Sequence, residues 1–358
     1  MPPNTRPRTL LLRCAVLALI AALPVAFSVW IDPARLRPWP REERAIAQAL
    51  LAGHNVTDVT NFNDRAIERL LADGRVHAPD VLSIGSSRIQ ALPAVGFPAR
   101  SFVNAGVSGA DLDDLLSVYA LYDTVPRRPR RVVLNLDPWT VIRDPSPPAW
   151  GRLIASHTAI VRRLGDSTPQ WRSWLTTRVS GLKRMAAPEY FRLAVYSIRQ
   201  CGPSGIRFLV ADRADNAEKT KTPDGTLIWP RRPPDTAALA VRDYVSRVRR
   251  GTAPYAGRDS DVLAARAPVL ERFLRMLRQD GVDVDVLLVP FHPLVYAEFA
   301  RGAHNATYDL DAWYRALARR TGANVVGGYD PAVAGATEAD FFDELHLRPE
   351  ALVRLFRR

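Results

Sequence analysis

Five short, nearly continuous apolar runs constrain the fold of this chain more than any other feature. Each run suits a strand buried in a parallel sheet, and helical patterns separate the runs. Strands that alternate with helices indicate βαβ units and a sheet covered on both faces. The runs lie at 81–85, 102–105, 131–136, 284–289 and 324–326, and the helical patterns at 112–122, 262–278, 310–320 and 349–356. We expect an α/β fold, a flavodoxin-like three-layer sandwich with a mostly parallel five-stranded sheet, and a site at the carboxyl ends of its strands.

Two regions depart from this alternation. Residues 38–74, ahead of the first run, have a helical pattern of apolar side chains. Residues 145–260 are rich in Pro and Trp, and Asp224-Gly225 predicts a hairpin turn among them. The same region contains helical patterns at 158–163, 171–183 and 190–199. We interpret 145–260 as a mainly helical insertion that caps the strand ends, within one α/β domain that spans 36–358.

The segment 1–35 contains a candidate membrane anchor. An apolar run of about 18 residues, Cys14 to Ile31, has the length of one membrane crossing. It follows Arg6, Arg8 and Arg13 on a tail without acidic residues, which places the N-terminus in the cytoplasm. A signal peptide cleaved near Ala26-Phe27-Ser28 is the alternative, but the length of the run favours an uncleaved anchor. We therefore expect a single-pass protein of the bacterial inner membrane with a periplasmic domain.

The strongly basic composition does not indicate a nucleic-acid partner. The formal charge is +12, but the arginines are scattered through helices and loops, and no RNA-binding motif or zinc-ligand spacing occurs. We interpret the charge as favouring solubility and contact with anionic glycans or lipid surfaces. Cys201 is the only cysteine after the apolar run, so no intramolecular disulfide is expected in the domain.

Two distant motifs contain the residue types of an acyl-transfer site. Gly85-Ser86-Ser87 ends the first apolar run, and Asp343-Glu344-Leu345-His346 precedes the last helical pattern. A serine becomes nucleophilic when a histidine accepts its proton and a carboxylate orients that histidine. We expect Ser87 to be the nucleophile, His346 the general base and Asp343 the residue that orients it.

The segments around these motifs resemble the SGNH, or GDSL-type, hydrolase family. Residues 81–88 are similar to its first block, with Ser86 where the family usually has Asp. Residues 102–109 are similar to the second block, which implies that the backbone N–H groups of Ser87 and Gly109 form the oxyanion hole. The fold implied is an SGNH-like α/β domain.

The third block departs from the family pattern. Asn135-Leu136-Asp137-Pro138-Trp139 replaces the family's Gly-x-Asn-Asp stretch, and no Asn stands at the matching place. Loss of one oxyanion donor typically costs about 10²- to 10³-fold in kcat. We expect a gap on the oxyanion side, bordered by residues 137–139. This altered block resembles membrane-anchored D-alanyl transfer proteins and SGNH-like proteins of polysaccharide O-acetylation.

Two further side chains are candidates for substrate contact. His292 follows the fourth run and should lie at the same edge of the sheet, although a structural histidine is an equal alternative. Trp139 is a candidate for stacking on a sugar ring, but packing beneath the insertion is slightly favoured for it. The glycine-rich segments lack the P-loop and Rossmann patterns, and the histidines lack metal-ligand spacing, so no cofactor or metal is expected.

The resemblance implies a periplasmic serine esterase or acyltransferase. Its substrate would be a small acyl group, expected to be acetyl, on an envelope polysaccharide, and the reaction would pass through an acyl-serine intermediate. The expected partners are that polysaccharide or another acylated substrate, and a membrane-bound acyltransferase. The altered third block keeps an alternative open, a catalytically silent accessory protein that binds glycan or scaffolds such an acyltransferase.

Overall fold

The computed structural model describes most of the chain, and all structural statements below concern the described residues. These are 6–33, 41–60, 62–99, 101–123, 128–142, 153–165, 179, 181, 183–202, 207–212, 218–230, 233–253, 260–301 and 306–357.

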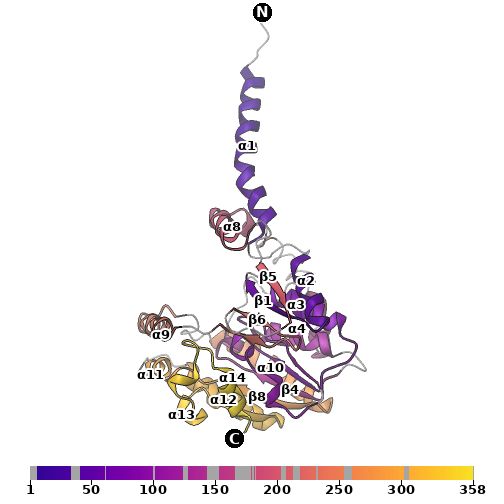
Figure 1. Ribbon diagram of the computed structural model, residues 1–358, viewed down its shortest axis with the longest axis vertical. Coiled ribbons are helices and arrows are strands. Elements are labelled where there is room, and N and C mark those ends of the chain that lie inside the picture. Colours follow the sequence, from indigo (N-terminus) through magenta and orange to yellow (C-terminus); the bar gives the residue numbers. More distant parts are fainter. Residues whose placement is uncertain are drawn as a thin grey trace, which may run out of the picture.

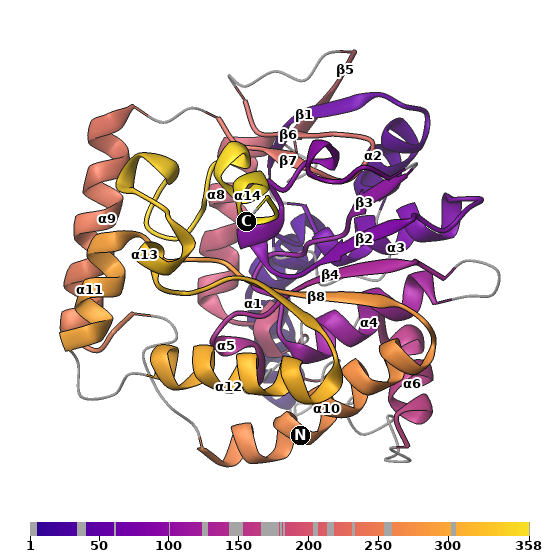
Figure 2. The same ribbon diagram turned by 90° about the horizontal axis from the view of Figure 1, so that it is seen from below.

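A five-stranded sheet forms the centre of the α/β fold (Figure 2). Its strands are β2 (Val81–Ile84), β3 (Phe102–Asn104), β4 (Arg131–Asn135), β8 (Asp283–Leu288) and β9 (Asn324–Gly327). All neighbouring strands are parallel, in the order β3-β2-β4-β8-β9. This is the second-first-third-fourth-fifth order of flavodoxin-like sheets. The five predicted strands are therefore confirmed, each within one residue of its predicted ends.

Helices cover one face of this sheet, and a helix with two short turns covers the other. Leu82, Val132 and Val286 pack on one side with the helices α4 (Leu112–Tyr122), α10 (Ser260–Gln279) and α12 (Ala306–Thr321). Their sequence neighbours pack on the other side with α14 (Pro349–Leu355) and the 3-10 turns η1 (Ser87–Ile89) and η2 (Ala94–Gly96). Both faces of β2, β3, β4 and most of β8 are thus buried, whereas the edge strand β9 is only half-buried. Burial on both faces explains why the sequence shows continuous rather than alternating apolar runs.

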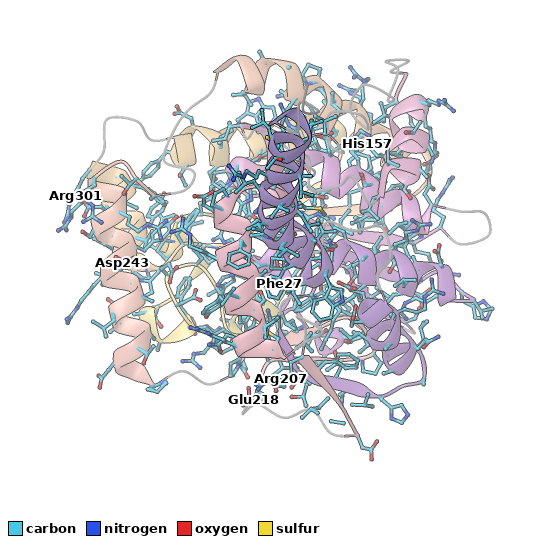
Figure 3. The ribbon with its side chains drawn as sticks, turned by 90° about the horizontal axis from the view of Figure 1, so that it is seen from above. Phe27, His157, Arg207, Glu218, Asp243 and Arg301 are labelled. Atoms are coloured by element: carbon cyan, nitrogen blue, oxygen red, sulfur yellow. The ribbon has the colours of Figure 1, made fainter. Side chains whose placement is uncertain are left out.

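A second sheet, which the sequence did not predict, lies beside the first. Its strands are β1 (Asn55–Thr60), β5 (Arg207–Ala211), β6 (Thr220–Lys221) and β7 (Leu227–Ile228), in the order β5-β1-β6-β7. All of its pairings are antiparallel. In Figure 3 the labelled residues Arg207 and Glu218 lie at this sheet, at the lower edge of the view.

The composition of the second sheet corrects two expectations. Residues 38–74 are not helical throughout, because β1 separates α2 (Arg41–Leu51) from α3 (Asp64–Gly74). The insertion at 145–260 is not simply a helical cap, since it also contributes β5, β6 and β7 to a sheet whose remaining strand precedes the central sheet in the chain. The N-terminal segment and the insertion therefore build one structural unit together.

The predicted hairpin turn joins the two sheets. Asp224-Gly225 connects β6 and β7, and Gly225 has a φ of 89°, which favours glycine. The backbone N–H of Asn104 in β3 donates to the carbonyl of Asp224 at 2.8 Å. A Cβ on Gly225 would lie 2.1 Å from the carbonyl oxygen of Asn104, so only glycine allows this approach.

The remaining helices lie around these two sheets. Helices α6 (Ile154–Arg163) and α8 (Pro188–Cys201) match the helical patterns at 158–163 and 190–199, whereas most of 171–183 lies outside the described residues. The α6 helix packs on α4, and α9 (Pro234–Arg249) packs on α11 (Pro293–Arg301). The short helices α5 (Trp139–Ile142) and α13 (Pro331–Ala334) follow β4 and β9.

The N-terminal helix α1 (Arg6–Ile31) projects from the rest of the molecule (Figure 1). Its part Thr9–Ile31, 23 residues, is long and apolar enough to cross a membrane. Helix α8 packs against the end of α1 that meets the domain, where the Tyr190 hydroxyl donates to Asp32 at 2.7 Å. Phe27, labelled in Figure 3, contacts Phe191 with ring centroids 5.5 Å apart.

Candidate active site

The candidate nucleophile lies on a tight turn at the carboxyl end of β2. Ser87 begins η1, a single 3-10 turn. Gly85 is needed just before it, because a Cβ there would lie 2.5 Å from the Cβ of Asn135. The hydroxyl of Ser86 accepts from the backbone N–H of Arg88 at 3.2 Å and so caps the turn. Ser86 is buried, whereas Ser87 is half-buried and accessible.

The structure brings the three predicted catalytic residues into one hydrogen-bonded chain. His346 Nε2 lies 2.9 Å from Ser87 Oγ, although the two residues are 259 positions apart. His346 Nδ1 lies 2.8 Å and 3.0 Å from the two carboxylate oxygens of Asp343. These distances fall within the range that proton transfer from a nucleophile to a general base requires.

The loop that carries Asp343 and His346 fixes the carboxylate before any substrate binds. Asp343 Oδ1 accepts from the backbone N–H groups of Leu345 at 3.0 Å and His346 at 2.9 Å. Burial acts to raise the pKa of Asp343, but the hydrogen bond and charge of His346 and the two backbone donors outweigh it and lower that pKa to about 2. Asp343 is therefore a carboxylate at neutral pH, as the orienting residue of a triad must be.

Arg88, next to the nucleophile, makes hydrogen bonds that connect the Ser87 turn to the loop that carries Asp343 and His346. Its side chain is 1% exposed and donates to the Leu345 carbonyl at 3.2 Å, within the His346 loop. It also donates to Asp137 at 2.8 Å and to the carbonyls of Val289 and Pro290, each at 2.7 Å. One guanidinium thus links the turn after β2, the end of β4, the end of β8 and the catalytic loop. The only signal of this role in the sequence is a basic residue beside the expected nucleophile, which does not distinguish a buried arginine from an exposed one.

The third block does not border a gap, contrary to our expectation. Asp137 and Trp139 are 1% and 3% exposed, and the Arg88 guanidinium lies against Asp137. Asn135 directs its amide oxygen to the Ser86 backbone N–H at 3.2 Å, behind the nucleophile. The altered block is therefore a packed support beneath the turn.

The second block forms the loop on the other side of Ser87. Asn104 is fully buried and donates to the carbonyls of Ile89 and Leu92, while its amide oxygen accepts from Gly106. The backbone N–H of Val107 donates to the Gly85 carbonyl at 2.9 Å, which binds this loop to the nucleophile turn. Gly109 follows with a φ of 61° and is half-buried. Its place in the oxyanion hole stays a prediction.

The two predicted substrate-contact residues are both buried. Trp139 donates from its indole N–H to the Ala110 carbonyl at 3.1 Å and packs in the core, as the favoured alternative predicted. His292 is 5% exposed, packs against Phe341, and accepts from the Leu294 backbone N–H at 3.3 Å. Burial lowers its pKa, with opposing effects of nearby Glu338 and Asp343. His292 thus packs beside the segment that leads into the catalytic loop, and its contact with a substrate stays a prediction.

The second sheet contributes residues to the site that the sequence analysis did not identify. Trp229, just after β7, packs against His346 with ring centroids 5.1 Å apart. Lys219, just before β6, places its ammonium 4.7 Å from the Trp229 ring centroid and 5.0 Å from that of Phe62. Only the docking of the hairpin brings these residues to the triad, so no local sequence pattern could have shown it.

Within the described ranges, no group of three His, Cys, Asp or Glu side chains is placed to hold a metal ion. Comparisons of the chain with models of known protein families, with curated proteins and with solved structures found no match. The function is therefore argued from the geometry of this site.

Proposed function

We propose that this protein is a membrane-anchored serine esterase or acyltransferase of the SGNH type. The observation that carries the proposal is the continuous chain of hydrogen bonds from Ser87 through His346 to Asp343. Each of these residues has common structural roles, but their alignment at the carboxyl edge of one parallel sheet provides a base for the serine and an anion for the base.

The arrangement supports acyl transfer in two steps. Ser87 Oγ attacks the carbonyl carbon of an ester while His346 Nε2 accepts the hydroxyl proton. The tetrahedral intermediate then collapses, the C–O bond to the leaving alcohol breaks, and His346 returns the proton to that alcohol. An acyl-Ser87 ester remains, and water or a second hydroxyl regenerates the serine by the reverse proton movements.

The oxyanion would be stabilised by backbone donors. The Ser87 N–H lies at the first position of η1, where a 3-10 turn offers no internal acceptor for it. Gly109 lies in the loop that is bonded to the nucleophile turn and is the expected second donor. The buried third block supplies no side-chain donor to the oxyanion, so we expect a modest kcat.

The proposed substrate is a small acyl group, with acetyl as the first candidate, on an envelope polysaccharide. Helix α1 supports a membrane anchor, and the basic tail ahead of it favours a periplasmic domain. A membrane-bound acyltransferase is the proposed partner. Activity of a C-terminal reporter in the cytoplasm would reject this location.

Covalent labelling tests the proposal. A fluorophosphonate should label the parent protein, and Ser87→Ala should abolish labelling without changing the circular dichroism spectrum. The matched control is Ser86→Ala, since Ser86 is adjacent but buried, and this variant should still be labelled. An unlabelled parent protein would favour the accessory protein instead, with the triad kept only as structure.

A further inference from the structure

An aromatic and cationic cluster from the second sheet lies directly against the triad. It consists of Lys219, Trp229 and Phe62. The Trp229 ring is inclined by 31° to the His346 ring, with 5.1 Å between the centroids. The Trp229 ring contacts both the catalytic histidine and the Lys219 ammonium, so one aromatic side chain connects this ammonium to the triad.

Lys219 has no anionic partner among the described residues. Its ammonium contacts the faces of two aromatic rings, but no described carboxylate lies within ion-pair distance. The charge of Asp64 acts to raise the pKa of Lys219. One oxygen of Asp64 is already used, because it accepts from the Ser108 backbone N–H at 2.7 Å and from Gln90 at 3.3 Å.

This arrangement costs stability unless a ligand completes it. Burial lowers the pKa of Lys219, and Asp64 opposes that effect only in part. An ammonium has three N–H donors, and ring faces satisfy them poorly compared with oxygen atoms. The indole N–H of Trp229 is also buried and finds no acceptor in the described part of the chain. Unsatisfied donors beside a catalytic histidine are a feature of a binding site rather than of a packed core.

Lys221, two residues away, shows what a structural lysine looks like in the same sheet. It is 1% exposed, pairs with Glu68 at 3.0 Å and donates to the Gly225 carbonyl at 3.1 Å. Lys219 is less buried, and its ammonium makes neither kind of contact with the residues that the structure describes. The difference assigns Lys221 to folding and leaves Lys219 for a ligand.

We propose that Lys219, Trp229 and Phe62 form a subsite for an acidic group of the acyl acceptor, a carboxylate or phosphate carried on a sugar. Lys219 would bind the anion, and the aromatic rings would bind the apolar face of the sugar. This inference rests on the proposed function, because it names the class of glycan that the acyl-transfer site would take. The acidic group would hold a neighbouring sugar hydroxyl near His346.

Binding to the full-length chain in detergent micelles tests the subsite. Calorimetric titrations would use the Ser87→Ala background, which prevents turnover of esters. The probes are trigalacturonic acid and its neutral methyl ester for the carboxylate, and glucose 6-phosphate and glucose for the phosphate. We expect one of the two acidic probes to bind about 10-fold more tightly than its neutral match, because a charge-assisted hydrogen bond is gained. The preference should shrink as salt is added.

Two lysine variants and a control separate charge from folding. Lys219→Gln should abolish the acid preference, whereas Lys219→Arg should keep most of it. Lys183→Gln removes the same charge from an exposed lysine and should leave the acid preference unchanged. Equal binding of both acidic probes and their neutral matches by the Ser87→Ala protein would overturn the subsite, as would an acid preference that survives Lys219→Gln.

The outcome is independent of the labelling of Ser87. Fluorophosphonate labelling without an acid preference would reject the subsite alone. An acid preference without labelling would reject the proposed enzymatic function and would indicate a protein that binds acidic glycans. The probe that shows the preference identifies carboxylate or phosphate as the recognised group.

Discussion

The two sheets contribute to the candidate site in opposite ways. The parallel sheet supplies Ser87, Asp343 and their supports. Asp343 and Arg88 are buried, Ser87 is half-buried, and all three are hydrogen-bonded, with Arg88 only 1% exposed and making four hydrogen bonds. The antiparallel sheet supplies Lys219 and Trp229, which are half-buried and lack acceptors for their N–H groups within the described ranges. Its strand β5 is largely exposed.

The contrast indicates a division between chemistry and recognition. Proton transfer needs distances held to a few tenths of an ångström, which packing on several sides provides. Recognition needs donors that a ligand can satisfy, so those groups remain incomplete in the unliganded protein. Loss of the supporting residues of the first sheet should therefore lower the rate or the stability, whereas loss of Lys219 or Trp229 from the second should mainly change binding.

The largest effect is expected for Asp343→Asn. An amide cannot stabilise an imidazolium as a carboxylate does and can enforce the wrong tautomer, so kcat for p-nitrophenyl acetate should fall by about 10⁴-fold. Asp340→Asn is the matched control in the same loop, because Asp340 bonds Arg354 and Thr337 instead. A kcat for Asp343→Asn within tenfold of the parent protein would remove Asp343 from the triad.

Arg88→Met should cause the largest loss of stability. The substitution keeps much of the volume but leaves Asp137 buried without its partner, which typically costs about 3 to 5 kcal/mol in the free energy of unfolding. Arg69→Met removes an exposed arginine whose pair with Asp73 is 3.7 Å long, and it should cost less than about 1 kcal/mol. Urea unfolding would measure both, and similar costs would contradict the central role of Arg88.

Gly225→Ala tests the junction between the two sheets. The new Cβ would meet the Asn104 carbonyl at 2.1 Å, and the residue would keep a φ of 89°. We expect a loss of about 3 kcal/mol from strain and overpacking together. Gly53 has the same φ but nothing within 4 Å, so Gly53→Ala should cost only about 1 kcal/mol.

Binding and labelling of the Gly225→Ala protein then test whether the two sheets have separate roles in recognition and chemistry. Displacement of the hairpin should weaken binding of the acidic probe, while Ser87 should remain reactive towards fluorophosphonate. Loss of labelling in a folded Gly225→Ala protein would show that the two sheets do not act separately.

The smallest effect concerns pH. The folded pKa of Asp343 is lowered from 3.8 to about 2, so its contribution to stability is fully present above about pH 4 and is lost as the pH falls towards 2. The expected size is about 2 kcal/mol. The difference in unfolding free energy between the parent protein and Asp343→Asn should therefore shrink on acidification over this range, and a difference independent of pH would contradict it.

The sequence predicted the central sheet because four of its five strands are buried on both faces. Continuous apolar runs such as Val81–Ile84 mark such strands directly. The second sheet lacks such apolar runs. Its strand β1 has the sequence Asn-Val-Thr-Asp-Val-Thr and pairs with strands about 150 residues later in the chain. Its strands β6 and β7 are only two residues long. Pairing over such distances is set by tertiary packing and not by local preference.

The same distinction holds within the site. Ser87, Asp343 and His346 were predictable because they follow strands of the central sheet or enter its last helix. From the sequence alone Trp139 is a candidate sugar contact, but it is buried in the structure, and the aromatic ring beside His346 is Trp229.

Detection of an acyl-enzyme tests the central claim most directly. After brief incubation with p-nitrophenyl acetate, mass spectrometry of the acid-quenched full-length protein should find one acetyl group on Ser87. The modification should be absent from Ser87→Ala and present in Ser86→Ala, because only Ser87 is hydrogen-bonded to His346. An acetyl group on Ser86, or a protein that releases p-nitrophenol with Ser87 unmodified and replaceable by alanine, would contradict the account.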